Sequence, residues 1–327
     1  MKAQTSSAAP AIAMDKAVSV LKAAGDSQRA LILRILSHDA FGVLELSRIF
    51  DVRQPAMSHH LKILSQAGLV IYRREGTCIF YRRGFYEQDG FDQLRQQIFA
   101  QLDKSPVPAE IEARIEAVHS ERAETSRVFF RENAERFREQ QDLIASYVQY
   151  GDTVLTMIDD LNLPASGHAL EIGPGEGQLL PELAARFQSV TALDNSAEML
   201  AASERFAAGK GSGNIRFVCE DIADGQQKIR ASLVTANMVL HHLARPGDVI
   251  RRIYGMLGDS GALVVTELCQ HDQDWAHSAC GDLWLGFCPE ELASWATGAG
   301  FVEGKSQYLA QRNGFRIQLR QFLKTSG

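Results

Sequence analysis

The chain has 327 residues, of which 45% are hydrophobic and 23% are charged, and its formal net charge is −6. This composition is that of a globular protein, and no run approaches the ~18 consecutive apolar residues that a membrane span needs. Five scattered cysteines without a CxxC pair argue against a disulfide framework, so we expect a reducing, cytoplasmic environment. The length favours two domains.

Charge is distributed unevenly along the chain. Residues 1–102 contain 13 Lys and Arg against 9 Asp and Glu, whereas the remainder is acidic. A basic first third on an acidic body is typical of a nucleic-acid-binding module joined to a ligand-binding domain.

The first hundred residues predict a small helical domain that ends in a β-hairpin. Residues 1–14 are small and polar, and we expect a disordered tail there. Apolar spacing then predicts four helices and two strands, at residues 15–24, 27–37, 43–50, 54–67, 69–74 and 77–83. Pro55 stands at the start of the fourth helix, and Glu75-Gly76 forms the tight turn between the strands. This order predicts a winged helix-turn-helix over residues 15–102.

Polar residues of the fourth helix and arginines of the hairpin form the candidate DNA interface. The helical residues can share a face that enters a major groove, and the arginines suit phosphate contacts. The candidates are Gln54, Ser58, His59, His60 and Lys62 of the helix, and Arg73, Arg74, Arg82 and Arg83 of the hairpin. For His60, a packing role agrees with the sequence as well as a phosphate contact does.

Three segments carry a family resemblance, namely 46–50 (LSRIF), 54–64 (QPAMSHHLKIL) and 67–70 (AGLV). They resemble the ArsR/SmtB-type repressors, which implies a homodimer that binds a palindromic operator. Residues 43–47 lack the cysteine-rich motif of the metal-sensing members, and the predicted helix at 89–102 contains no histidine, so no metal is expected. That helix suits a dimer interface or an ordinary core, because one side carries Phe91, Leu94, Ile98 and Leu102.

Residues 103–161 are predicted to link two domains. A proline-containing break at 104–108 precedes a highly charged helical segment at 110–140 and a second helical segment at 142–161. These helices either cover a ligand site or only space the domains.

From residue 168 onward, strand-like and helix-like segments alternate. Strands at 168–172, 189–193, 215–219, 232–236 and 262–267, with two later runs at 306–310 and 315–322, predict an α/β fold with a doubly wound parallel sheet over residues 162–327. The first strand leads into Gly173, Gly175 and Gly177 and then into a helix, an order that suits a nucleotide-like ligand. Asp194 follows Gly173 by 21 residues, at a strand end where a carboxylate can accept both ribose hydroxyls.

Further segments specify the ligand, namely 171–177 (EIGPGEG), 194–200 (DNSAEML), 219–222 (CEDI) and 238–243 (MVLHHL). They resemble the class I S-adenosylmethionine-dependent methyltransferases, which implies a seven-stranded Rossmann-like sheet that binds S-adenosylmethionine or S-adenosylhomocysteine. The implied contacts are Glu171 at the ammonium, Gly173, Gly175, Gly177 and Asn237 at the amino-acid moiety, Asp194 at the ribose, and Met199, Asp221 and Ile222 at the adenine. Asn195 is a further expected contact of the ligand. A dehydrogenase is disfavoured because no complete GxGxxG is present.

Methyl transfer would need a base near the ligand's sulfur. The candidates are His241, His242, Glu267 and His271, and each also suits a structural role. The aromatic-rich segment 272–287 suits either the roof of a small pocket or packing over the sheet. A nearby group of possible metal ligands matches no zinc spacing; it comprises Cys269, His271, His277, Cys280 and Cys288.

Two functions therefore remain open. The whole-chain architecture resembles S-adenosylhomocysteine-responsive regulators of the methionine cycle, which implies a repressor whose methyltransferase-like domain binds an S-adenosyl effector. The alternative is an active methyltransferase of a small molecule with an attached DNA-binding regulator. The sensor is the favoured interpretation.

Overall fold

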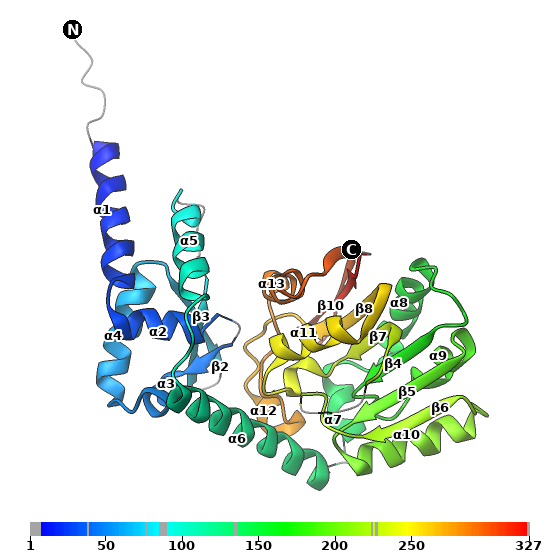
Figure 1. Ribbon diagram of the computed structural model, residues 1–327. Helices are drawn as coiled ribbons and strands as arrows, with labels where there is room; N and C mark the ends of the chain where they lie inside the picture. The colour runs from blue at the N-terminus through cyan, green and yellow to red at the C-terminus, as the bar shows by residue number, and fades with distance from the viewer. Residues whose placement is uncertain are drawn as a thin grey trace. The chain divides into compact units, whose positions relative to one another are not determined.

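Figure 1 shows the computed structural model of the chain, which describes residues 8–37, 39–75, 78–84, 90–133, 137–223, 225 and 228–325. The chain divides into two compact units, Met1–Val118 and His119–Gly327. Within the described ranges, no helix has the length and apolar character required to cross a membrane.

The first unit is a winged helix-turn-helix, as predicted. Its small antiparallel sheet has the strand order β1-β3-β2, and α3 and α4 form the helix-turn-helix. The elements are α1 (Ala8–Ala24), α2 (Ser27–Ile35), β1 (Phe41–Gly42), α3 (Val43–Phe50), α4 (Gln54–Gln66), β2 (Val70–Glu75), β3 (Cys78–Arg83) and α5 (Asp92–Leu102).

Local sequence signals set the helix boundaries in this unit. Asp26 accepts a hydrogen bond from the backbone N–H of Arg29 and caps α2, and Pro55 lies in the first turn of α4. Asp51, with a φ of 54°, ends α3 in the left-handed conformation. Apolar residues from α2, α3 and α4 fill one core whose fully buried members include Ile32, Leu33, Leu46, Ile49, Met57, Leu61 and Leu64.

The start of the chain differs from the prediction. Helix α1 begins at Ala8, so residues 8–14 of the predicted tail are helical, and residues 1–7 lie outside the described residues. The alanine-rich run gives these residues a high helix propensity, which explains the extension. The predicted turn at Gly76 and the first residue of the predicted helix at 89–102 also lie outside the described residues.

The predicted linking segment is occupied by three helices, α6 (Ala109–Asn133), α7 (Phe137–Ile144) and α8 (Tyr147–Asp160). The division between the units falls inside α6, after Val118, and not at residue 103. Apolar spacing explains this difference: Ile111 and Val118 belong to the core of the first unit, whereas Ile144 and Val154 belong to that of the second. The helices therefore do more than separate two domains.

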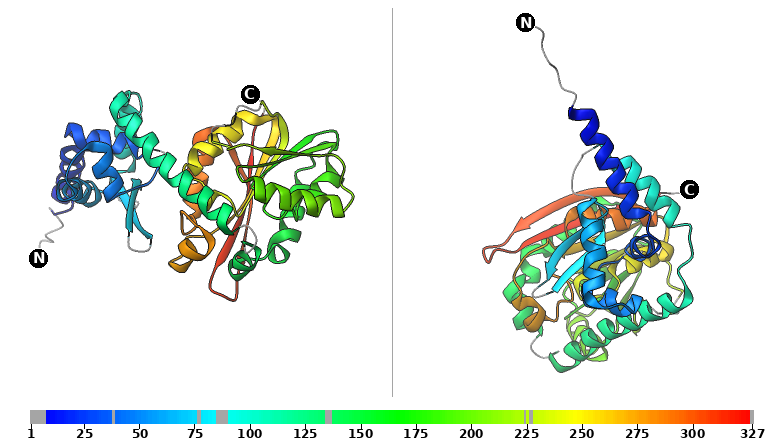
Figure 2. Two further views of the ribbon diagram at one scale, coloured as in Figure 1. Left: turned by 90° about the horizontal axis from the view of Figure 1, so that it is seen from below. Right: turned by 90° about the vertical axis from the view of Figure 1, so that its left-hand side faces the viewer.

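The second unit has the predicted doubly wound sheet of seven strands, in the order β6-β5-β4-β7-β8-β10-β9. Strands β6, β5, β4, β7 and β8 are parallel, and β10 pairs antiparallel with both β8 and β9. Strands β9 and β10 form the long hairpin at one edge (Figure 2). The strands are β4 (His168–Ile172), β5 (Ser189–Asp194), β6 (Ile215–Cys219), β7 (Ala231–Asn237), β8 (Leu257–Leu268), β9 (Val302–Ala310) and β10 (Arg316–Leu323).

Helices cover both faces of this sheet (Figure 1). Residues of α8, α9 and α10 share one apolar core with alternate strand residues such as Ala169 and Leu233. On the opposite face, α11 and α13 pack against each other. The helices between the strands are α9 (Leu180–Arg186), α10 (Ala197–Gly209), the 3₁₀ turn η1 (Leu240–His242), α11 (Pro246–Met256), α12 (Trp275–Cys280) and α13 (Pro289–Ala299). The carboxyl ends of the parallel strands are the usual position for a ligand in such sheets.

Candidate functional site

In the first unit, one face of α4 is polar and exposed. Four predicted DNA contacts lie on it: Gln54, Ser58, His59 and Lys62. The buried positions recur every three or four residues on the opposite face, at Met57, Leu61 and Leu64. The helix therefore presents hydrogen-bonding side chains in the arrangement that a major groove can accept.

The arginines of the hairpin have different environments. Arg74 is exposed opposite Ile79 in the β2–β3 register, whereas Arg73 and Arg82 are half-buried. Arg53 lies directly before α4 and is exposed. It was not among the predicted contacts, although a cation beside the first turn of this helix is well placed to contact a phosphate.

Two of the residues considered as DNA contacts, Arg83 and His60, lie against other parts of the first unit. Both guanidinium N–H groups of Arg83 donate to the Asp103 carboxylate, at 2.9 and 2.8 Å, and the guanidinium carbon lies 4.5 Å from the centre of the Phe99 ring. Arg83 therefore holds α5 against the hairpin. His60 is half-buried and lies close enough to Asp26, at the start of α2, for its charge to help lower the pKa of that carboxyl. The backbone hydrogen bond from Arg29 lowers this pKa most, burial opposes the shift, and the charge of Arg29 adds more than that of His60. This location favours packing for His60.

In the second unit, two adjoining cavities lie at the carboxyl ends of the parallel strands. The first is lined by seven predicted ligand contacts, namely Gly173, Gly175, Asp194, Asn195, Met199, Asp221 and Ile222. The second is lined by Glu171 and Asn237 and again by Gly173 and Gly175. Because the cavities share the glycine turn and Met238, they suit the two ends of one elongated ligand.

The turn after β4 requires glycine for two separate reasons. Gly173 has a φ of 61°, and a Cβ there would lie 2.4 Å from a methyl carbon of Val239. Gly177, with a φ of 85°, lines neither cavity; a Cβ on it would lie 2.9 Å from the backbone of Ser203 in α10. Gly177 therefore allows close packing between the turn and a helix, and its contact with a ligand stays a prediction.

The second cavity contains buried polar groups. Glu171 on β4 is buried, which raises the pKa of its carboxyl to about 8, and its Oε2 has no hydrogen-bond partner among the described residues. The hydroxyl of Tyr147, on α8, is likewise buried without such a partner in the described ranges. Thr266 donates a hydrogen bond of 2.7 Å to Oδ1 of Asn237 and thereby orients that amide. These groups can bind the ammonium and carboxylate of an amino acid.

The first cavity has an acidic edge and an apolar wall. Burial and the neighbouring charge of Asp221 raise the pKa of Asp194 to about 6, although hydrogen bonds from the backbone of Ser196 and Asn195 oppose the shift. Met199 and Ile222 are buried and supply apolar surface. A carboxylate beside a flat apolar slot is suited to a ribose with its attached base.

Helices preceding the sheet also line the cavities. Ser126 and Phe130 of α6 border the first cavity, and Tyr147 and Tyr150 of α8 border the second. Of the two alternatives left open by the sequence, covering a ligand site is the one that this placement favours. The individual residues were missed because helical periodicity identifies an apolar face without identifying what it covers.

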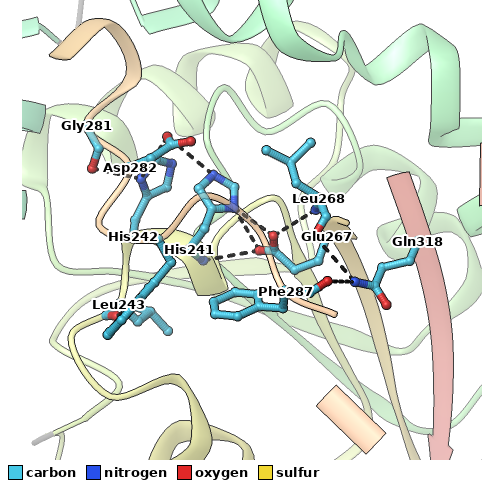
Figure 3. A network of polar contacts seen from close by, with 10 residues as sticks. His241, His242, Leu243, Glu267, Leu268, Gly281, Asp282, Phe287 and Gln318 are labelled. Carbon is cyan, nitrogen blue, oxygen red and sulfur yellow. Dashed lines mark hydrogen bonds and ion pairs between the residues drawn. The ribbon is translucent and has the colours of Figure 1, made fainter. Parts of the chain in front are cut away.

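Figure 3 shows the polar network around the two adjacent histidines. Nδ1 of His241 lies 2.8 Å from the buried Glu267 carboxylate, which also accepts a hydrogen bond from the backbone of Leu268. Burial alone would lower the pKa of His241, but the charges of Glu267 and Asp282 outweigh it and raise this pKa to about 9. His242 is also buried, and together with the charge of His241 this lowers its pKa well below the usual value.

Of the four candidate bases, the structure brings His242 to a cavity wall. His241 and Glu267 are paired with each other behind that wall, and Nδ1 of His271 accepts a hydrogen bond from the backbone of Gln273 while its ring packs on Phe315. None of these three lines either of the two cavities, so His242 is the candidate that the structure places beside a ligand bound there.

The segment 272–287 contributes buried aromatic and aliphatic side chains to the second unit. Trp284, Leu285 and Phe287 are buried, and none of them lines the two cavities. The cysteines and histidines considered as metal ligands in and around this segment have separate partners: Arg316 donates to Cys269, and Cys288 approaches Glu291. Within the described part of the chain, the three side chains that meet as possible metal ligands are instead His241, His242 and Asp282.

A winged helix with a polar recognition helix and a doubly wound sheet with a glycine turn and an acidic strand end define a DNA-binding regulator joined to a methyltransferase-type domain. Family comparisons agree. Residues 26–72 match the model described as "Bacterial regulatory protein, arsR family", and residues 170–263 match "Methyltransferase domain". The chain belongs to the arsR family of transcriptional regulators and carries a fused methyltransferase domain.

Individual relatives match one part or the other. An uncharacterised helix-turn-helix transcriptional regulator of Methanocaldococcus jannaschii is 43% identical over 70 residues, which are 20% of this chain and 76% of that protein. A carboxy-S-adenosyl-L-methionine synthase of Shewanella piezotolerans is 33% identical over 101 residues, 30% of this chain and 41% of the relative.

A solved structure with the same fold as the second unit is that of a Burkholderia thailandensis methyltransferase, 1,6-didemethyltoxoflavin-N1-methyltransferase, with bound S-adenosylhomocysteine. It has a TM-score of 0.52 and 20% identity, over 68% of this chain and 93% of that one. This likeness concerns the fold.

Proposed function

We propose that this regulator binds S-adenosylhomocysteine or S-adenosylmethionine across its two adjoining cavities, and that the ligand changes its affinity for operator DNA. Glu171, Asn237 and Tyr147 would hold the amino-acid end, and Asp194 the ribose. Asn195, Met199, Asp221 and Ile222 would surround the adenine side. The curated synthase relative and the solved methyltransferase, whose names include S-adenosyl compounds, support this class of ligand.

The observation that carries the proposal is that residues of α6 belong to both units. This helix supplies Ile111 and Val118 to the core of the DNA-binding unit, and Ser126 and Phe130 to the first cavity. A ligand that contacts Phe130 therefore acts on a helix that the DNA-binding core also includes. A difference in ligand affinity between two states of this helix would appear as a difference in DNA affinity.

We propose that the functional form is a cytoplasmic homodimer. It would bind a palindromic operator and repress transcription from it. Met14, Val18 and Leu21 of α1 are exposed apolar residues at helical spacing, so they form a stripe along that helix. A second copy of the chain would cover it. Two-fold symmetry in the protein then requires related half-sites in the DNA.

The test measures operator binding with each ligand. A duplex selected from random-sequence DNA by the purified full-length protein is titrated in fluorescence anisotropy, without ligand and with saturating S-adenosylhomocysteine or S-adenosylmethionine. We expect at least one ligand to change the dissociation constant by about 5- to 150-fold, the usual range of coupling between sites. Equal affinities in all three titrations would refute the sensor function.

A second candidate function is methyl transfer to a small molecule. His242 favours it, because this buried histidine lies on the wall of the first cavity and its lowered pKa keeps it neutral, as a general base must be. Release of S-adenosylhomocysteine from S-adenosylmethionine, measured with a panel of small nucleophiles, tests this activity. Turnover that His242→Ala abolishes would support it, and turnover at the uncatalysed rate throughout would exclude it for that panel.

A further inference from the structure

Three side chains of types that can bind a metal meet beside the first cavity, namely His241, His242 and Asp282 (Figure 3). Nε2 of His241 and Nδ1 of His242 each lie 3.8 Å from Oδ1 of Asp282, and the three ligand atoms lie within 4.8 Å of one another. The histidines come from η1, and Asp282 follows α12 and Gly281. Distant segments of the chain therefore converge on one buried point.

The spacing of these atoms is larger than hydrogen bonding requires and close to that of a coordination sphere. A hydrogen bond between a ring nitrogen and a carboxylate oxygen is about 2.7–2.9 Å long when the pair is charged. Two ligand atoms bound at about 2.1 Å to one tetrahedral ion lie about 3.4 Å apart. Shifts of a few tenths of an ångström would bring both nitrogens and the Asp282 oxygen to bonding distance of a common ion.

The surroundings of the trio also suit a metal. The Glu267 carboxylate lies 2.8 Å from Nδ1 of His241, on the side of the ring away from Asp282, and such a carboxylate commonly orients a metal-bound histidine. The side chains of Glu267 and Asp282 are fully buried, so a divalent ion between neutral imidazoles would balance two carboxylate charges in a region that excludes water.

We propose that His241, His242 and Asp282 bind one divalent first-row transition-metal ion, of the zinc or iron(II) type. Two imidazoles and one carboxylate are the ligand set that such ions accept, and a three-residue set leaves a further coordination position open. Nε2 of His241 would release its proton to solvent when it binds the ion, while Nδ1–H continues to donate to Glu267. His242 would exchange its hydrogen bond to the carbonyl of Gly281, 3.2 Å long, for the bond to the metal, and its proton would move to Nε2. Because His242 also lines the first cavity, the ion would lie next to the proposed ligand.

The test uses the full-length protein after chelator treatment and dialysis, with Zn²⁺ alone as the probe. A competition titration against a chromophoric chelator gives affinity and stoichiometry, and the visible spectrum after addition of Co²⁺ reports the coordination geometry. We expect one high-affinity ion per chain. Asp282→Asn and His242→Gln should each weaken binding at least about 10-fold, because even outer-shell changes cost that much. His59→Gln, at an exposed histidine of α4, is the matched control and should bind as the wild type does.

The result that overturns the proposal is zinc binding with the same affinity and stoichiometry in the wild type, Asp282→Asn and His242→Gln, or no high-affinity ion at all. Circular dichroism and thermal unfolding establish that each variant is folded. If Asp282→Asn does not fold, His242→Gln alone decides the outcome. Binding of S-adenosylhomocysteine to the same metal-free samples is measured separately, so failure of the metal site leaves the proposed sensor function testable.

Discussion

The burial of Glu171 makes ligand binding dependent on pH. With a pKa raised to about 8, most of this carboxyl is protonated at pH 7. The ammonium of an S-adenosyl ligand would favour the charged carboxylate and lower that pKa. We therefore expect binding at pH 7 to release close to one proton per ligand, and affinity to rise between pH 6 and pH 8. Calorimetry in two buffers of different ionisation enthalpy measures the proton count.

Glu171→Gln is the matched control for this pH dependence, because it keeps the shape of the side chain and cannot ionise. The variant should release no proton from this position and should bind about 10- to 100-fold more weakly, as expected when a hydrogen bond to a charged group is lost. Wild-type binding that exchanges no proton in either buffer would contradict the assignment of Glu171 to the ligand's ammonium.

Asp194 provides a second prediction at the opposite end of the site. Its carboxylate at the edge of the first cavity would accept the ribose hydroxyls, so Asp194→Ala should lower the affinity for S-adenosylhomocysteine about 10- to 100-fold. Isothermal titration measures this loss. Binding of the ligand-free variant to operator DNA should equal that of the wild type, since Asp194 lies in the second unit. An unchanged ligand affinity would show that the ribose lies elsewhere.

Single residues could be predicted where a local pattern fixes their position. Glu171 and Asp194 occupy ends of parallel strands, so alternation and strand order place them at one edge of the sheet. Asp282 could not be found in this way, since about 40 residues separate it from the histidines and no spacing rule connects them. Gly177 has the spacing of a ligand contact, but its role in packing depends on the position of Ser203.

At the scale of elements, the hairpin should contribute a salt-dependent part of DNA binding. Arg74 is exposed on β2, so Arg74→Ala should reduce the slope of log affinity against log salt concentration by about 1 and weaken binding to all sequences alike. Arg83→Ala is the comparison: its guanidinium binds Asp103, so this variant should lower the melting temperature and leave the slope unchanged. Anisotropy titrations at four salt concentrations distinguish the two. The same slope in wild type and Arg74→Ala would show that Arg74 of the β2–β3 hairpin does not contact the DNA.

Helix α1 supports a prediction about assembly. Leu21 is 53% exposed within an apolar stripe, and Leu21→Glu would place a charge in the proposed dimer interface. We expect the dimer dissociation constant to rise at least about 10-fold, which corresponds to about 1.4 kcal/mol. Sedimentation velocity over a range of concentrations measures it. Leu44→Glu, at a residue of α3 that is 60% exposed, is the control and should remain dimeric. Identical sedimentation of both variants would place the dimer contact elsewhere.

Strong periodicity made most elements predictable. The strands β4 and β6 have the predicted boundaries, because each is a short apolar run between turn signals. The connecting helices were harder: α7 and α8 separate at Ser146, whose capping box with Gln149 begins α8 inside a segment predicted as one helix. Domain boundaries were least predictable, since a helix can contribute to two cores without any change in its local pattern.

At the scale of the whole molecule, the main feature is that one helix, α6, contributes residues to both units. Its early residues pack in the DNA-binding core and its later residues border the first cavity, and these contributions come from one continuous helix. Coupling between two sites is reciprocal, so a ligand that weakens DNA binding must itself be bound more weakly by the DNA-bound protein, and by the same factor. This reciprocity distinguishes a sensor from an enzyme that merely carries a DNA-binding domain.

The most direct measurement is therefore the dissociation constant of S-adenosylhomocysteine with and without saturating operator DNA, with a scrambled duplex as control. The sensor function predicts a change of at least about 5-fold with operator, equal to the factor by which the ligand changes operator affinity, and no change with the scrambled duplex. The same dissociation constant in all three conditions, for a protein that binds both the ligand and the operator, would contradict it.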